Sequence, residues 1–318
     1  MSSPLLDHNI DLLSDNRLSS YTTFKLGGPA KGIIHCRTAQ ELVYTVLLLN
    51  FQRERFILIG GGSNLVVSDQ GLDCYVIRYV SEAPIIRLRG QELVVGAGTV
   101  LDHLAAYSAT KGLSGLNYTS GIPGTVGGAI VGNAGAFGRQ VGDVLVSATI
   151  MDLKGQKRTV KNAELKFQYR HSVLKETQDI VLEAVFQVQG ADPLLLLKER
   201  EEILTIRHEK HPDLTKNPCA GSFFRNIEPT SKAEHRQAAG WFLDKAGGKS
   251  LVYGGAAIYP KHANIIIKNQ DCCAQDVFEL SKMMAGLAKV HFNLDLEREV
   301  RFVGQFEGKP AHISDVIW

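Results

Sequence analysis

The sequence predicts an α+β protein of two domains, and three observations support this. Its 318 residues exceed what one small core requires. Before residue 190, short strand-like apolar runs alternate with two glycine-rich segments; after residue 190, long helical patterns predominate. We therefore expect domains at residues 1–190 and 191–305 and a tail at 306–318, with two α+β subdomains of the first domain at about 1–75 and 76–190.

The helices are predicted from capping residues and apolar periodicity. Thr38 and Glu41 form a capping-box pattern before a helix that runs to about residue 53. Asp192 followed by Pro193 is typical of a helix start, and this helix runs to about residue 208. Further helices are expected at 101–112, from a capping box at Ser231 and Glu234 to residue 247, and at 274–290.

The strands are predicted from short apolar or alternating runs. Phe56–Ile59 is the clearest, because it is wholly apolar and ends in three glycines. A closing strand is expected at 296–303, where alternation places Glu299 on a face with other charged side chains. The remaining strands are expected at 65–67, 75–78, 85–89, 93–95, 144–151 and 180–188.

Composition excludes several classes of function. The 35 basic and 33 acidic residues are well mixed, so no nucleic-acid partner is expected. The N-terminus lacks the pattern of a secretory signal, and no apolar run approaches the length of a membrane span. We expect a cytoplasmic protein without membrane insertion. The five cysteines lack metal-ligand spacing and no HxxxH pair occurs, so reduced thiols and no metal site are expected.

Two glycine-rich segments suggest a phosphate-binding surface. Glycine lets backbone amides approach a ligand closely, and a run of such amides can hold phosphate oxygens. The first segment, IGGGSN at 59–64, lacks the third glycine and the following helix of a dinucleotide-binding turn. It also lacks the Gly-Lys-Ser/Thr ending of a Walker loop. Taken alone, it fits a tight structural turn equally well.

The second segment, GIPGTVGGAIVGNAGAFG at 121–138, contains seven glycines. Structural turns rarely need so many. Two such segments in one domain indicate a bound pyrophosphate and an extended cofactor.

Five motifs in order resemble one family. IGGGSN (59–64), SGIPGTVGGAI with NAGAFG (120–138), YRHS (169–172), AGSFFRN (220–226) and LEREVRFVG (296–304) are together similar to the UDP-N-acetylenolpyruvoylglucosamine reductase (MurB) family. The resemblance implies an FAD-binding domain of the PCMH or vanillyl-alcohol-oxidase type, followed by a C-terminal α+β substrate domain. It also implies an enzyme that passes a hydride from NADPH to non-covalent FAD and then to the enolpyruvyl group of a UDP-sugar, giving UDP-N-acetylmuramate for peptidoglycan.

By the same resemblance, the two glycine segments bind FAD. The implied cofactor-binding residues are Gly60, Gly61, Gly62, Ser63, Asn64, Leu65, Gly121, Ile122, Pro123, Gly124, Thr125, Gly127, Gly128, Ala129, Asn133, Ala134 and Gly135.

The resemblance also implies three catalytic residues. Arg170 suits the developing enolate of the substrate carboxylate, because its planar fork binds carboxylates. Ser222 is the implied proton donor, and Glu299 is the implied partner of the enolate. From the residues alone, Arg170 and Glu299 fit solvated charges and Ser222 fits a buried serine bonded to backbone.

The implied substrate-binding residues are Tyr169, Lys210, Gly221, Arg225, Asn226 and His262. A packing role for Tyr169 and a surface role for His262 remain open alternatives. The expected ligand is a small UDP-sugar and the expected state is a monomer.

The chain departs from the family at a few positions. It has Thr22-Thr23 where the family often has Asn-Thr, and Arg225-Asn226-Ile227 where the family usually has Lys-Asn-Pro. The short interval between Arg170 and Ser222 resembles the subtype that lacks a substrate-capping insertion.

Two other functions remain open. A flavin oxidase of the same fold is one, although neither glycine segment contains the histidine or cysteine that would tether a flavin. A non-catalytic nucleotide-sugar sensor is the other.

Overall fold

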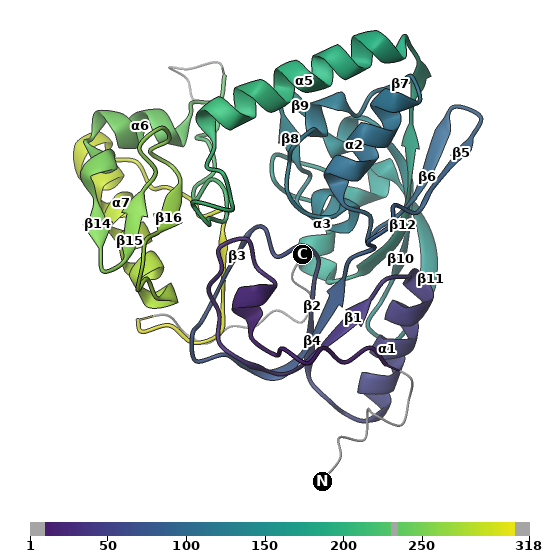
Figure 1. Ribbon diagram of the computed structural model, residues 1–318, viewed down its shortest axis with the longest axis horizontal. Helices are drawn as coiled ribbons and strands as arrows, with labels where there is room; N and C mark the ends of the chain where they lie inside the picture. The colour runs from purple at the N-terminus through teal and green to yellow at the C-terminus, as the bar shows by residue number, and fades with distance from the viewer. Residues whose placement is uncertain (1–9, 230–234, 309–318) are drawn as a thin grey trace.

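The computed structural model describes residues 10–229 and 235–308. Figure 1 shows two bodies bridged along one side by the long helix α5 (Pro193–Lys210). One body contains the elements before α5 and the other contains those after residue 235.

The N-terminal elements form a three-stranded parallel sheet in the order β1-β4-β2. Its strands are β1 (Ala30–Cys36), β2 (Phe56–Ile59) and β4 (Leu72–Tyr79), and helix α1 (Ala39–Phe51) connects β1 to β2. The predicted α1 is confirmed, since Thr38 Oγ1 accepts a hydrogen bond from the Glu41 amide. Strand β1 was not predicted, because Gly32 and His35 interrupt its apolar pattern.

The middle of the chain forms a five-stranded antiparallel sheet in the order β11-β10-β12-β6-β5. Its strands are β5 (Ile86–Arg89), β6 (Glu92–Gly96), β10 (Leu145–Met151), β11 (Lys157–Lys161) and β12 (Ile180–Gln187). Helix α2 (Leu101–Thr110) ends before Gly112, which has the positive φ expected of a helix cap. One buried apolar cluster joins this sheet to α1, β2 and β4.

Short elements complete this body. They are β7 (Leu113–Ser114), α3 (Val126–Val131), β8 (Gly135–Ala136), β9 (Arg139–Gln140), α4 (Leu174–Thr177) and β13 (Gln189–Gly190). No helix is predicted from the sequence where α3 lies, because Gly127 and Gly128 lower its helix propensity.

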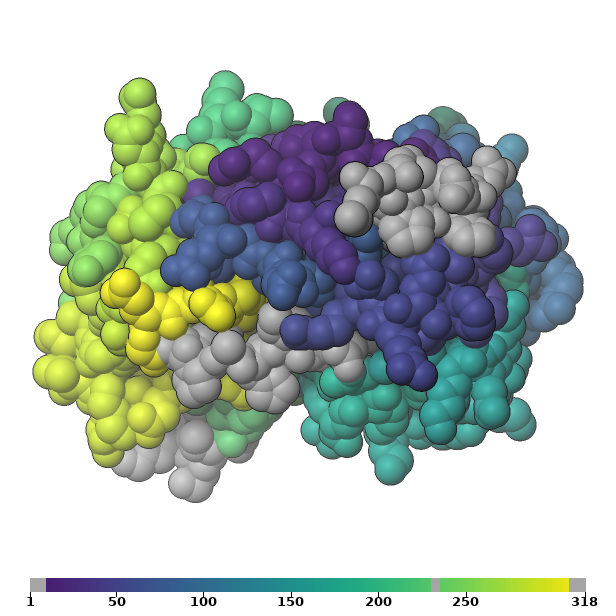
Figure 2. Space-filling model, turned by 90° about the horizontal axis from the view of Figure 1, so that it is seen from below, coloured from purple at the N-terminus to yellow at the C-terminus, as the bar shows by residue number. Residues whose placement is uncertain are grey.

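The second body is a smaller α+β module. It contains α6 (Ala239–Lys245), α7 (Ala274–Phe292) and a sheet of β14 (Val252–Tyr253), β15 (Ala256–Ile258) and β16 (Ile266–Lys268). Its core includes Phe24, Leu26 and Val66 from the N-terminal region. Figure 2 shows the N-terminal residues, in purple and blue, lying against the yellow C-terminal module. The early part of the chain therefore anchors both bodies.

Two predictions in this region fall partly outside the described residues. The capping box at Ser231 and Glu234 lies outside them, and the described helix α6 begins at Ala239. Most of the tail predicted at 306–318 also lies outside them.

Helix α5 is fixed to the first body by an ion pair. Arg200 donates from Nη1 and Nη2 to the two carboxylate oxygens of Asp102 on α2, at 2.7 and 2.8 Å. Asp102 Oδ1 also accepts a hydrogen bond from the Gly121 amide at 2.7 Å. Since one carboxylate contacts both α5 and the second glycine segment, it fixes their relative position.

The closing strand predicted at 296–303 is wrong over most of its length. Only β17 (Arg301–Val303) is a strand, and it pairs in parallel with β3 (Leu65–Val67). The preceding residues pair instead with the segment around Phe223, where the Glu299 amide donates to the Phe223 carbonyl at 2.8 Å. The chain changes partner after Glu299, so the regular alternation of faces is broken there.

Within residues 10–229 and 235–308, no helix has the length and apolar character to cross a bilayer. All five cysteines are free thiols. The same described residues contain no cluster of three potential metal ligands.

Candidate active site

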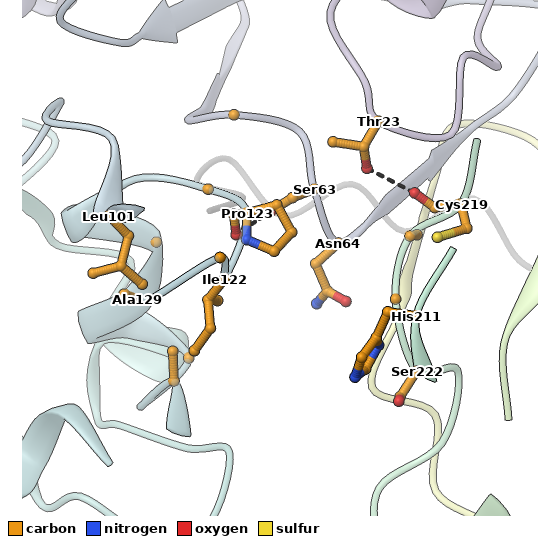
Figure 3. A pocket seen from close by; sticks show the side chains of 18 of the residues that line it. Thr23, Ser63, Asn64, Leu101, Ile122, Pro123, Ala129, His211, Cys219 and Ser222 are labelled. Carbon is orange, nitrogen blue, oxygen red and sulfur yellow. Dashed lines mark hydrogen bonds between the residues drawn. The ribbon is translucent and has the colours of Figure 1, made fainter. Parts of the chain in front are cut away.

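A cavity of about 900 Å³ lies between the two bodies. Both glycine segments, one end of α5 and the segments around Ser222 and Glu299 line it. Figure 3 shows Leu101, Ile122 and Ala129 on one side of the cavity and His211 and Ser222 on the other.

The two glycine segments touch each other along one wall. Ser63 Oγ donates to the Pro123 carbonyl at 3.1 Å. A Cβ atom on Gly60 would lie 2.4 Å from Thr125 Oγ1, and one on Gly61 would lie 3.2 Å from the Gly124 Cα atom. Glycine is required here by close approach of the two loops.

These loops present free amides to the cavity. In the described part of the chain, the backbone N–H groups of Gly61, Gly62, Ser63, Gly124 and Thr125 donate to no protein acceptor. All five residues line the cavity. Unpaired amides on a glycine-rich surface are the groups that bind phosphate oxygens, so this wall fits the pyrophosphate of a dinucleotide.

Most of the proposed cofactor residues line the cavity, and three lie behind its wall. Leu65 is buried in strand β3, and the Gly127 amide donates to the Ala97 carbonyl. The side chain of Asn133 bonds to the Gln168 carbonyl, the Gln140 side chain and the Gly142 amide. These three contacts support the loops from behind.

Arg170 and Glu299 form an ion pair in the cavity wall. Arg170 Nε lies 2.8 Å from Glu299 Oε1, and both side chains are mostly buried. Burial raises the pKa of Glu299 above its ordinary value of 4.5, while the positive charges of Arg170, Lys175 and Arg225 oppose the rise. A carboxyl group with a raised pKa is suited to holding a proton.

The backbone of Glu299 is tied to the first glycine segment. Asn64 Nδ2 donates to the Glu299 carbonyl at 3.0 Å, and the Arg301 amide donates to the Asn64 carbonyl at 3.0 Å. The segment that carries Glu299 is therefore positioned directly by the loop of free amides.

Ser222 faces the same cavity from the C-terminal body. It pairs with Ile265 and follows Gly221, whose φ of +75° is one that glycine adopts readily. Arg170, Ser222 and Glu299, the three residues proposed as catalytic, thus line one cavity together with the glycine segments.

The proposed substrate residues are more dispersed. Gly221 lines the cavity. Tyr169, Arg225 and Asn226 lie behind Arg170, where Tyr169 Oη accepts from the Asn226 amide at 3.3 Å and Arg225 Nη2 donates to the Arg170 carbonyl at 2.9 Å. Lys210 is exposed at the end of α5.

His262 does not line the cavity but stacks on a residue that does. Its ring lies 5.7 Å from that of His211, centroid to centroid. Burial is the main cause that lowers the pKa of His211 to about 4, so this ring is neutral at pH 7.

The structure adds cavity residues that the sequence did not indicate. Among them are Lys175, Arg207, His211 and Arg301. Burial, with the charges of Arg225 and Arg301, lowers the pKa of Lys175 to about 8. Arg301 lies in the motif at 296–304 without an assigned role, and no motif contains the other three, because their proximity depends on how the two bodies pack.

Comparison with known proteins agrees with this architecture. Residues 30–161 match the family model described as "FAD binding domain", and residues 212–303 match "UDP-N-acetylenolpyruvoylglucosamine reductase, C-terminal domain". The UDP-N-acetylenolpyruvoylglucosamine reductase 1 of Bacillus cereus is 36% identical, over 92% of this chain and 95% of that protein. The corresponding reductase of Caldicellulosiruptor bescii is 34% identical, over 95% of this chain and 94% of that protein.

A solved structure has a similar fold. The UDP-N-acetylenolpyruvylglucosamine reductase (MurB) of Thermus caldophilus superposes with a TM-score of 0.75 at 30% identity, covering 92% of this chain and 98% of that chain. The expected fold, an FAD-binding domain followed by a C-terminal α+β domain, is confirmed. The chain therefore belongs to the UDP-N-acetylenolpyruvoylglucosamine reductase (MurB) family.

Proposed function

We propose that this protein is an NADPH-dependent flavoenzyme that reduces UDP-N-acetyl-3-O-(1-carboxyvinyl)-glucosamine to UDP-N-acetylmuramate for peptidoglycan synthesis. One observation carries the proposal: Arg170, Ser222 and Glu299 line the same cavity as two glycine loops with free amides. The names of the chain's relatives support the choice of substrate.

The residues present fit non-covalent FAD. The free amides of Gly61, Gly62, Ser63, Gly124 and Thr125 would hold its pyrophosphate. Bound there, FAD would supply a hydride carrier between NADPH and the enolpyruvyl double bond of the substrate.

Arg170 would stabilise the charge that develops on the substrate carboxylate. Its guanidinium is permanently charged, and its partial burial strengthens its interaction with an anion. Lys175, Arg207 and Arg301 also line the cavity, so its basic side chains outnumber the two acidic ones, Glu299 and Asp213. The balance favours an anionic substrate group.

Ser222 would donate the proton to the substrate carbon that bears the carboxylate. A serine hydroxyl is a weak acid, so its alkoxide needs nearby positive charge or a further proton source. The raised pKa of Glu299 suits it to hold a proton in the same cavity.

The cytoplasmic location and monomeric state remain predictions.

The function is tested by following flavin absorption anaerobically. The purified protein should be yellow, NADPH should bleach it, and the enolpyruvyl substrate should restore the colour. A protein without flavin would overturn the proposal. Fast reoxidation when oxygen is admitted without substrate would indicate an oxidase, and ligand binding without NADPH oxidation would indicate a sensor.

A further inference from the structure

Arg170 occupies a strained position in a tight turn. The Gln168 amide donates to the His171 carbonyl at 3.0 Å, and the His171 amide donates back to the Gln168 carbonyl at 3.1 Å. Between them Arg170 has a φ of +55°. A residue with a side chain adopts this left-handed conformation only at a cost, so surrounding contacts must hold it there.

Two cations hold the carbonyl oxygen of Arg170. Lys175 Nζ donates to it at 2.6 Å and Arg225 Nη2 donates to it at 2.9 Å. We call this pair of contacts the carbonyl clamp. Arg225 is itself fixed, because its Nη1 lies 2.8 Å from Glu297 Oε1.

The clamp sets the direction of the Arg170 side chain. Arg170 Nε lies 2.8 Å from Glu299 Oε1, but its N–H is not aligned with this oxygen and has no hydrogen-bond acceptor among the described residues. Contacts of the guanidinium with Glu299 therefore do not fully fix its orientation. The Tyr169 ring, whose centroid lies 5.3 Å from Arg170 Cζ, and the backbone conformation that the clamp maintains contribute as well.

Placing the charged Lys175 side chain here costs electrostatic free energy that a lysine with a purely structural role would avoid. It lines the cavity beside Arg225 and Arg301, which repel its charge. Burial and this repulsion lower its pKa to about 8. A side chain kept in such surroundings is more simply explained by a role at the site than by stability.

We propose that Lys175 is a positioning residue for Arg170, and that the carbonyl clamp it forms with Arg225 keeps Arg170 in the left-handed conformation that directs its guanidinium into the cavity. The proposal rests on the proposed function only for its kinetic readout. Lys175 itself need not touch the substrate.

The first test compares K175M with K175R and with K154M, a matched change at an exposed lysine. Loss of a charge-assisted hydrogen bond that orients a catalytic group should lower kcat for the enolpyruvyl substrate by roughly tenfold to a hundredfold. The rate of flavin reduction by NADPH should stay within about twofold of the wild-type rate, and the flavin absorption spectrum should be unchanged. K175R should recover most of the activity because it restores a cationic donor, and K154M should have no effect. Unchanged turnover in K175M would overturn the proposal.

The second test places K175M in an R170A background. If Lys175 acts only through Arg170, the second change should cost less than about twofold once Arg170 is absent. Equal losses in both backgrounds would show that Lys175 acts independently, and the positioning role would be wrong.

A crystal structure of K175M separates this proposal from the proposed function. If the carbonyl clamp holds Arg170, loss of Lys175 should let Arg170 leave the left-handed region or let its guanidinium move away from Glu299. An unmoved turn would contradict it. This readout holds even if wild-type protein fails to oxidise NADPH, an outcome that would instead refute the proposed function.

Discussion

Arg170 and Glu299 meet as an ion pair, with 2.8 Å between Nε and Oε1, although Arg170 precedes helix α5 in the chain and Glu299 follows helix α7. Arg170 stands in a turn after the five-stranded sheet, whereas Glu299 lies where the chain passes from the C-terminal module to β3. Each residue depends on packing between the bodies for its position. The ion pair therefore forms only when the segments that carry Arg170 and Glu299 are packed together.

Replacing Arg170 by lysine should lower turnover while leaving flavin reduction intact. Lysine keeps the charge but loses the planar fork, so we expect kcat for the enolpyruvyl substrate to fall by roughly tenfold to a thousandfold. Stopped-flow measurement of each half-reaction checks this. R87K, at an exposed position, is the control. Equal slowing of flavin reduction by NADPH would contradict the assignment of Arg170 to the substrate.

Removing the charge of Glu299 should change the pH dependence of stability. Burial raises the folded-state pKa above 4.5, so from about pH 4.5 up to the raised value the folded chain binds a proton that the unfolded chain has lost. The stabilisation from this protonation is present below pH 4.5 and is lost as pH rises through the folded-state pKa. E299Q cannot titrate, so the stability of the wild type relative to E299Q should fall with rising pH.

Urea unfolding of both proteins between pH 4.5 and 8 measures this difference. E82Q, on an exposed glutamate, is the control. A wild type that gained stability relative to E299Q with rising pH would show that the cations outweigh burial.

Ser222→Ala should separate the two half-reactions. Without the hydroxyl, protonation of the substrate carbon should slow by at least about a hundredfold, whereas bleaching of the flavin by NADPH should proceed at the wild-type rate. Single-turnover reoxidation by the enolpyruvyl substrate measures the loss. S147A, on strand β10, is the control. Normal reoxidation in S222A would exclude Ser222 as the proton donor.

Gly60→Ala should weaken flavin binding through its effect on the loops. The added Cβ would lie 2.4 Å from Thr125 Oγ1, so the Thr125 side chain or the glycine segments themselves must shift. We expect the Kd for FAD to rise by at least about tenfold, measured by flavin fluorescence. G190A is a matched control because its Cβ would have no neighbour within 4 Å. Unchanged affinity in G60A would place the pyrophosphate elsewhere.

The sequence indicated those parts of the site that depend on local chemistry. Gly60 and Gly61 stood out because a run of glycines exposes backbone amides to a ligand, and Thr38 and Asp192 marked helix starts through their own side chains. Lys175 and His211 gave no signal, because an ordinary lysine or histidine becomes a cavity residue only when distant segments pack around it. The strand predicted at 296–303 is too long because the chain changes its pairing partner after Glu299, and this change depends on contacts with Phe223 and Asn64.

A crystal structure of the purified protein with its own flavin would locate the cofactor. We predict that the FAD pyrophosphate lies on the amides of residues 61–63 and 124–125, with the isoalloxazine ring in the cavity facing Arg170, Ser222 and Glu299. A pyrophosphate bound away from those amides, or a ring remote from those three side chains, would contradict it.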